Sequence, residues 1–175
     1  MEARLRPAAL EDAEAVARLH VQIWRKTYGQ IAPADVVAPL SALDVRIERW
    51  RGMLAGRQSC TLVAELDGRI VGFGRCGAPS DPIFGARGEV KHLFVDNAHA
   101  RRGVGRALLG GLARELKRQG FSGIGLGVVK ENEPAIAFYR ALGGEPAGQY
   151  RDAGPLWRSD NLLIVWEDAS ALTGL

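Results

Sequence analysis

Residues 100–110 read Ala-Arg-Arg-Gly-Val-Gly-Arg-Ala-Leu-Leu-Gly, directly after the apolar run at residues 92–95. Two glycines and three arginines therefore stand where a strand pattern gives way to a helical one. The first N–H groups of a helix lack acceptors within the helix, and the helix dipole adds partial positive charge there. Because glycine has no Cβ, a phosphate can approach these amides closely. The stretch predicts a binding site for a phosphate or a diphosphate.

Two common nucleotide-binding motifs do not describe this stretch. A P-loop requires the pattern G-x-x-x-x-G-K-[ST], and neither its spacing nor its lysine is present. A dinucleotide fingerprint requires a third glycine three positions after the second, where this chain has Leu108 after Gly105. That fingerprint also belongs to the first strand of a βαβ unit. The phosphate ligand must therefore be of another kind.

The pattern along the rest of the chain predicts a single α/β domain over residues 1–175. Alternating or β-branched runs predict strands at residues 4–7, 60–66, 69–76, 89–95, 123–129, about 149–150 and 161–166. Helical spacing predicts helices over residues 10–26, 33–54, 104–119 and 132–142, with a possible break at Pro39. The order of these elements predicts a mixed sheet flanked by about four helices.

Composition and charge exclude several classes of protein. The 47% hydrophobic and 25% charged residues are ordinary for a globular protein, and no apolar stretch is long enough to span a membrane. Residues 1–7 lack the apolar block of a signal peptide, so we expect a cytoplasmic protein without a membrane partner. The net charge of +3 permits an anionic partner, but no nucleic-acid-binding motif accompanies it.

The two cysteines have neither metal-ligand spacing nor the pattern of a disulfide framework. They flank Asp67-Gly68, a two-residue hairpin signal. A tight turn there places Cys60 opposite Arg75 and Cys76 opposite Ser59, so the two thiols point to opposite faces of the sheet. We expect two reduced, buried thiols and no bound metal.

Three segments together resemble the acetyl-CoA-binding core of the GNAT acyltransferases, the general-control-type N-acetyltransferases. These segments are residues 89–95, residues 102–109 and residues 126–143. The resemblance implies a mixed, mostly antiparallel sheet of about seven strands, with acetyl-CoA as the acyl donor. The family usually has Gln or Arg three residues before the first glycine, where this chain has Ala100.

The resemblance also implies how the cofactor is held. The backbone amides of residues 102–106 are expected to bind the diphosphate, and the backbone of the strand before them to pair with the pantetheine arm. The expected cofactor-binding residues are Leu93, Phe94, Val95, Arg101, Arg102, Gly103, Val104, Gly105, Arg106, Asn132 and Tyr139.

Tyr139 matches the family's tyrosine that donates a proton to the departing thiolate. The alternative for Tyr139 is a core aromatic residue on an amphipathic helix. Asn132 is expected to contact the pantetheine or the substrate, although a helix N-cap alone explains an asparagine at this position.

Glu89 matches a glutamate that serves several family members as general base. An amine is almost fully protonated at neutral pH, so its proton must pass to a base directly or through water. On an alternating strand Glu89 shares a face with Lys91, Leu93 and Val95, and His92 lies on the other face as a core residue. The alternative for Glu89 is a structural pair with Lys91.

The acceptor is expected to be the primary amine of a small molecule, which attacks acetyl-CoA directly in a ternary complex. Two other functions stay open: acetylation of a protein amine, and a non-catalytic module that binds acyl-CoA. A homodimer is possible, because two-fold dimers are common. The candidates for the walls of the acceptor site are Trp24, Tyr28, Phe84, Trp50, Arg151, Asp152 and Trp157. Each of them is equally well explained as a core or loop residue.

Overall fold

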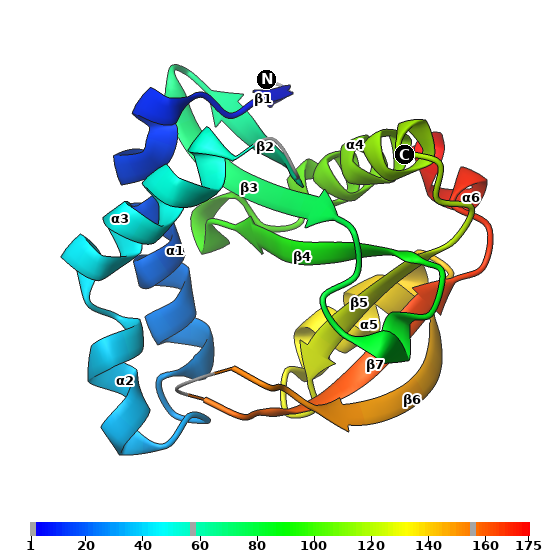
Figure 1. The fold of residues 1–175 in the computed structure, drawn as a ribbon. Coiled ribbons are helices and arrows are strands. Elements are labelled where there is room, and N and C mark those ends of the chain that lie inside the picture. Colours follow the sequence, from blue (N-terminus) through cyan, green and yellow to red (C-terminus); the bar gives the residue numbers. More distant parts are fainter. Residues whose placement is uncertain (1–2, 57–58, 155–156) are drawn as a thin grey trace.

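The computed structural model describes residues 3–56, 59–154 and 157–175, and its centre is one twisted sheet (Figure 1). The sheet has seven strands in the order β1-β2-β3-β4-β5-β7-β6, and only β4 and β5 pair in parallel. This confirms the predicted mixed, mostly antiparallel α/β sheet. The strands are β1 Arg4–Pro7, β2 Ser59–Leu66, β3 Arg69–Gly77, β4 Gly88–Val95, β5 Ile124–Val129, β6 Glu145–Arg151 and β7 Asp160–Trp166.

The described part of the chain forms six α-helices rather than about four. They are α1 Ala13–Tyr28, α2 Ala34–Leu40, α3 Leu43–Ala55, α4 Val104–Arg118, α5 Glu133–Ala141 and α6 Ser170–Thr173. The helix expected over residues 33–54 is two helices, because Pro39 lacks a backbone N–H and α2 ends one residue later. The short α6 was not predicted. Among these helices, none is long and apolar enough to cross a membrane.

The helices cover both faces of the sheet (Figure 1). On one face, α4 packs against β2, β3 and β4 through a fully buried stripe that includes Leu108, Leu112 and Leu116. An added Cβ at Gly74 would lie 2.6 Å from the Leu112 side chain, so α4 can lie this close only because β3 has a glycine there. On the other face, Trp50 of α3 and Phe73 of β3 are buried together with α1.

A β-bulge in the β2–β3 hairpin shifts the register that was expected for the cysteines. The pairing changes by one residue between Ala64 and Glu65, and Cys60 then lies directly opposite Cys76. The prediction that the two thiols point to opposite faces is therefore wrong, because one extra residue in a strand exchanges its faces. Both thiols are free; Cys76 is buried and Cys60 is half-buried.

A second bulge lies in β4 and changes the face of Glu89. His92 pairs with Arg75 but Val90 pairs with Cys76, which leaves Lys91 as the extra residue. Glu89 therefore lies on the face of His92 rather than on that of Leu93 and Val95. The expectation that Glu89 shares a face with Leu93 is wrong, because the extra residue exchanges the faces of the strand, as it does in the hairpin.

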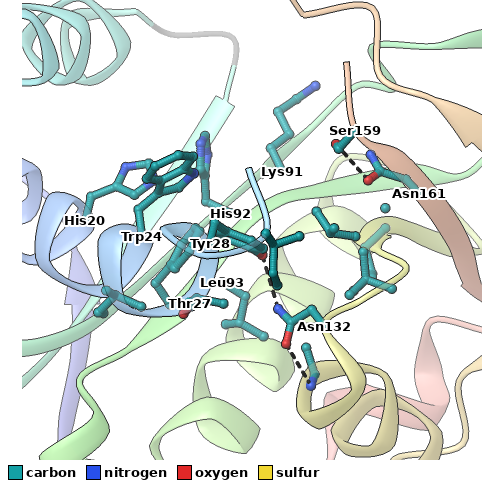
Figure 2. A pocket seen from close by; sticks show the side chains of 18 of the residues that line it. His20, Trp24, Thr27, Tyr28, Lys91, His92, Leu93, Asn132, Ser159 and Asn161 are labelled. Atoms are coloured by element: carbon teal, nitrogen blue, oxygen red, sulfur yellow. Dashed lines mark hydrogen bonds between the residues drawn. The ribbon is translucent and has the colours of Figure 1, made fainter. Parts of the chain in front are cut away.

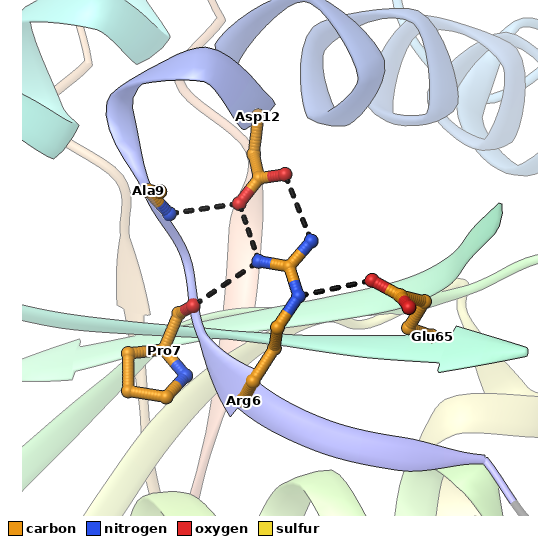
Figure 3. A network of polar contacts seen from close by, with 5 residues as sticks. All are labelled: Arg6, Pro7, Ala9, Asp12 and Glu65. Atoms are coloured by element: carbon orange, nitrogen blue, oxygen red, sulfur yellow. Dashed lines mark hydrogen bonds and ion pairs between the residues drawn. The ribbon is translucent and has the colours of Figure 1, made fainter. Parts of the chain in front are cut away.

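Ion pairs fix the start of α1 to the edge of the sheet (Figure 3). The Arg6 guanidinium donates to both carboxylate oxygens of Asp12, at 2.6 and 3.0 Å, and to Glu65 of β2 at 3.0 Å. Asp12 also accepts the backbone N–H of Ala9 at 2.7 Å. The hydrogen bond from Arg6 holds the pKa of Asp12 below its usual value. This network sets where α1 enters the layer that covers the site.

Candidate active site

A cleft opens where β4 and β5 diverge. The two strands pair only at Gly88–Ile124 and Glu89–Gly125, and beyond these pairs they separate. The cleft has a volume of about 780 Å³ and is lined by both strands, by α1 and by the start of α5. Figure 2 shows side chains from these elements converging on it.

The divergence leaves one edge of β4 without a partner strand. Asp96 donates its backbone N–H to the carbonyl of Val71 in β3 at 2.8 Å. Because hydrogen bonding alternates along an antiparallel pair, Phe94 and His92 also bond towards β3. The N–H and C=O groups of Leu93 and Val95 then point into the gap towards β5. This is the open edge expected for pairing with an extended ligand.

The turn before α4 presents main-chain donors, as the quoted stretch predicts. Gly103 caps the helix with φ of 82°, a conformation that L side chains rarely adopt, and an added Cβ would meet nothing within 4 Å. Ala107 donates to the Gly103 carbonyl at 2.9 Å, and among the described residues the amides at 102–106 have no acceptor. Arg101, Arg102 and Arg106 are exposed around them. These groups fit a diphosphate.

Gly105 is favoured by close packing rather than by its backbone angle. An added Cβ would lie 3.3 Å from the ring of Phe138 in α5 and 3.6 Å from Val95 at the end of β4. Contacts this close let α4, α5 and β4 meet at one point. Val104, the residue between the two glycines, is buried and anchors the first turn of α4.

Tyr139 of α5 lines the cleft and is 8% exposed. Burial raises the pKa of its phenol well above the usual value, so the hydroxyl is protonated at neutral pH. In the part of the chain that the structure describes, the hydroxyl has no hydrogen-bond partner. A protonated donor without a partner is free to serve a group bound in the cleft.

Asn132 joins α5 to α1 beside Tyr139. Its side-chain oxygen accepts the N–H of Ala135 at 3.4 Å, so Asn132 is the N-cap of α5. Its amide nitrogen donates to the hydroxyl of Tyr28 at 3.1 Å (Figure 2). Both residues line the cleft. The cap therefore also holds the Tyr28 hydroxyl in the wall of the cleft.

The structure does not bring Glu89 to the surface of the cleft. Glu89 is buried, and one carboxylate oxygen accepts the backbone N–H of Ser80 at 2.7 Å and the Lys91 ammonium at 2.8 Å. Lys91 and His92 line the cleft, whereas Glu89 does not. The alternative role, a structural pair with Lys91, matches this geometry.

Three of the candidate acceptor residues form an aromatic wall. Trp24 and Tyr28 of α1 and Trp157 of the β6–β7 loop lie with ring centroids 5.5 to 5.9 Å apart. All three line the cleft, and so does Asp152. Arg151 points away from it and pairs with Asp160 at 3.1 Å.

Two other candidates lie in the core instead of the cleft. Phe84 is 1% exposed and packs against β7, and Gly125 of the neighbouring β5 leaves room for its ring. Phe84 therefore belongs to the core and not to the wall of the acceptor site. Trp50 is fully buried and donates its indole N–H to Nδ1 of His20 at 3.1 Å. Aromatic residues in a sequence do not show whether they face a cleft or a core.

Several residues that line the cleft were missed from the sequence. They include His20, Arg46, Arg49, Ser159 and Asn161. Arg46 and Arg49 stand three positions apart, which places them on one side of α3, but arginines with this spacing usually lie on a solvated face. In the described ranges, no three His, Cys, Asp or Glu side chains are grouped so that they could hold a metal ion.

Comparisons with known proteins agree with this geometry. A model of the acetyltransferase (GNAT) family matches residues 14–143. An uncharacterized N-acetyltransferase of Bacillus subtilis, YuaI, is 31% identical over 173 residues, which cover 98% of this chain and 96% of that protein. Human N-acetyltransferase 8 is 32% identical over 100 residues, 57% of this chain and 44% of that protein.

Solved structures have the same fold at lower identity. The PaiA N-acetyltransferase of Thermoplasma acidophilum in complex with coenzyme A has a TM-score of 0.71 at 16% identity, over 94% of this chain and 98% of that one. The putative acetyltransferase yncA of Salmonella typhimurium with acetyl-CoA has a TM-score of 0.68 at 22% identity, over 95% and 94%. Because the family model matches most of the chain and YuaI aligns almost end to end, this chain belongs to the acetyltransferase (GNAT) family and is an N-acetyltransferase.

Proposed function

We propose that this protein transfers the acetyl group of acetyl-CoA to the primary amine of a small molecule, by direct attack in a ternary complex. One observation carries the proposal: the open edge of β4 leads directly into the free amides before α4, with Tyr139 beside that edge. A donor with an extended amide-containing arm and a diphosphate matches this series of main-chain groups.

The donor side uses main-chain groups almost entirely. The amides of residues 102–106 bind the diphosphate, and Arg101, Arg102 and Arg106 add positive charge around it. The backbone of Leu93 and Val95 pairs with the amides of the pantetheine arm. When bound, acetyl-CoA supplies the thioester that the amine attacks. Two similar structures are complexes with coenzyme A and acetyl-CoA, which supports this choice of donor.

Tyr139 is the general acid in this proposal. Its hydroxyl is protonated at neutral pH and donates this proton to the departing thiolate, and the proton that the attacking nitrogen releases restores the phenol. Asn132 keeps the start of α5 in place, and with it the phenol.

Glu89 is a positioning residue in this proposal, because its carboxylate is buried behind the cleft. It holds Lys91, the extra residue of the β4 bulge, and the loop at Ser80. The incoming ammonium then loses its proton to water in the open cleft before it attacks, since only the neutral amine is a nucleophile.

The size and walls of the cleft favour a small acceptor. The cleft of about 780 Å³ must take the arm of the donor as well, so the room left for the acceptor is that of a small molecule. The aromatic wall of Trp24, Tyr28 and Trp157 closes the side towards α1. The cytoplasmic location and a homodimer remain predictions from the sequence.

Release of free thiol from acetyl-CoA, measured with a panel of small amines and peptides, tests the proposal. We expect release with at least one small amine, and faster than with any peptide. Preference for peptides would indicate a protein N-acetyltransferase. Tight binding of acetyl-CoA without release for any acceptor would indicate a non-catalytic acyl-CoA-binding module.

A further inference from the structure

A second pocket adjoins the cleft on the side of α3. It has a volume of about 500 Å³ and shares Arg46, Arg49 and His92 with the cleft, so these side chains form a common wall. Arg75 of β3 completes its polar lining. We call this the arginine pocket; its other lining residues are Gly52, Met53 and Gly56.

The arginine pocket has more positive charge than the neighbouring groups balance. Within the described ranges, no carboxylate lies within 4.0 Å of Arg46, Arg49 or Arg75. Arg46 donates to the backbone carbonyl of Leu40, which satisfies a hydrogen bond but adds no negative charge. The charge of Glu89 attracts Arg75 at longer range, but the Glu89 carboxylate already forms an ion pair with Lys91. Three arginines therefore line one pocket, and no ion pair in the described ranges balances their charge.

Two buried polar atoms of residues that line this pocket also lack partners. Nε of Arg75 and Nδ1 of His92 are enclosed, and neither makes a hydrogen bond to the described residues. An unsatisfied buried donor costs about 1–3 kcal/mol, so such groups usually have a ligand or water as partner. Burial, and then the positive charges of Arg75, Arg46 and Lys91, lower the pKa of His92 to about 3. The imidazole is therefore neutral and can still donate one N–H.

We propose that the arginine pocket binds an oxyanion of the acceptor, so that the substrate is a small amine that also carries a carboxylate or a phosphate. The inference rests on the proposed function and names its substrate class. Arg75 and His92 donate to the oxyanion, and Arg46 and Arg49 neutralise it. The diphosphate of the donor has its own amides at residues 102–106, beyond the end of β4, which leaves the arginine pocket to the acceptor.

Product analogues test this pocket without requiring turnover. The probes are N-acetylglycine, N-acetyl-β-alanine and N-acetyl-4-aminobutyrate, each paired with its neutral amide, and N-acetylethanolamine phosphate paired with N-acetylethanolamine. Binding is measured by calorimetry at constant ionic strength, with and without coenzyme A. We expect at least one charged probe to bind at least tenfold tighter than its neutral partner. Equal affinity within all pairs, or no binding by any charged probe, would overturn the inference.

Three variants locate the effect. Arg75→Gln and Arg49→Gln are expected to remove the preference for the charged probe, and Arg49 is exposed, so its replacement leaves the fold intact. Arg51→Gln is the matched control, because Arg51 lies in the same helix, pairs with Glu48 and does not line the pocket. A preference that survives in both pocket variants would contradict the proposal.

The two proposals fail in different ways. Thiol release with equal rates for charged and neutral amines would overturn the oxyanion site and leave the acetyltransferase reaction intact. Absence of thiol release with every acceptor, together with tight and Arg75-dependent binding of a charged probe, would overturn the reaction and leave the site intact.

Discussion

The two sides of the cleft that we propose for the donor and for the acceptor are formed by different kinds of groups. The donor side is a continuous segment, residues 93–106, and acts mainly through backbone groups. The acceptor side combines side chains of α1, α3, β3 and the β6–β7 loop, from Trp24 to Trp157. A site made of main-chain groups keeps its affinity after most substitutions, except at its glycines. A site made of side chains changes its specificity with each substitution. The following predictions test this difference.

Tyr139→Phe is expected to have the largest effect on activity. Loss of the phenolic proton should lower kcat by about 10²-fold, the usual contribution of a general acid. The affinity for acetyl-CoA, measured by calorimetry, should change by less than about twofold, because the diphosphate amides remain intact. Tyr150→Phe is the control, since burial raises the pKa of Tyr150 to about 12 but its side chain does not line the cleft. Unchanged turnover in Tyr139→Phe would remove the acid assignment.

Gly103→Ala should weaken the donor side by roughly tenfold in acetyl-CoA affinity, the effect of about one hydrogen bond to a charged group. The matched control is Gly120→Ala at the other end of α4, where φ is 95° and an added Cβ also meets nothing. Both variants carry the cost of a left-handed alanine, about 1–2 kcal/mol of the free energy of unfolding. If urea titrations show equal losses of stability but both variants bind acetyl-CoA normally, the amides are not the donor site.

Glu89→Gln separates positioning from base catalysis. The amide can still accept from Ser80 but loses its charge opposite Lys91. A positioning role predicts that kcat/KM falls by roughly fivefold at every pH, the cost of about 1 kcal/mol. A pH profile of the variant checks this. If kcat/KM of the parent protein falls at acidic pH and that of the variant does not, Glu89 is instead the base. Lys91→Gln should reproduce the uniform loss.

Asp12→Asn should have the smallest effect on the reaction and act on stability. The Arg6 hydrogen bond lowers the pKa of Asp12 in the folded protein, so its stabilisation is present above the unfolded pKa and is lost as pH falls. At pH 7 the variant should lose about 2 kcal/mol of the free energy of unfolding. This difference should begin to shrink below about pH 4, where Asp12 of the unfolded chain takes up a proton, and should vanish below the lowered pKa of Asp12 in the folded parent.

Urea unfolding at several pH values measures the effect of Asp12→Asn. Glu14→Gln is its control, because Glu14 forms an exposed pair with Arg18 and should cost less than about 1 kcal/mol. A difference between parent and Asp12→Asn that stays constant down to the lowest pH would contradict the role given to the carboxylate. Acetyl-CoA affinity should be unchanged in both variants, since α1 lies on the acceptor side.

The sequence alone determined the features that depend on neighbouring residues. The strand at residues 89–95, the glycines at 103 and 105, the helix that follows and the Asn132 cap all lie where the local pattern places them. Each rests on backbone conformation or on helical spacing within one or two turns. The seven-strand sheet and the family followed from the resemblance that residues 89–95, 102–109 and 126–143 have to the GNAT acyltransferases.

Only the tertiary structure decided the arrangement of the side chains. One extra residue in β4 moved Glu89 to the other face, and one in the hairpin placed Cys60 opposite Cys76. Arg75 lines the same pocket as Arg46 and Arg49 because β3 and α3 pack together. No local sequence pattern relates Arg75 to these two arginines. The physical reason is that side-chain direction alternates along a strand, so a single bulge, which costs little locally, exchanges faces over the residues that follow.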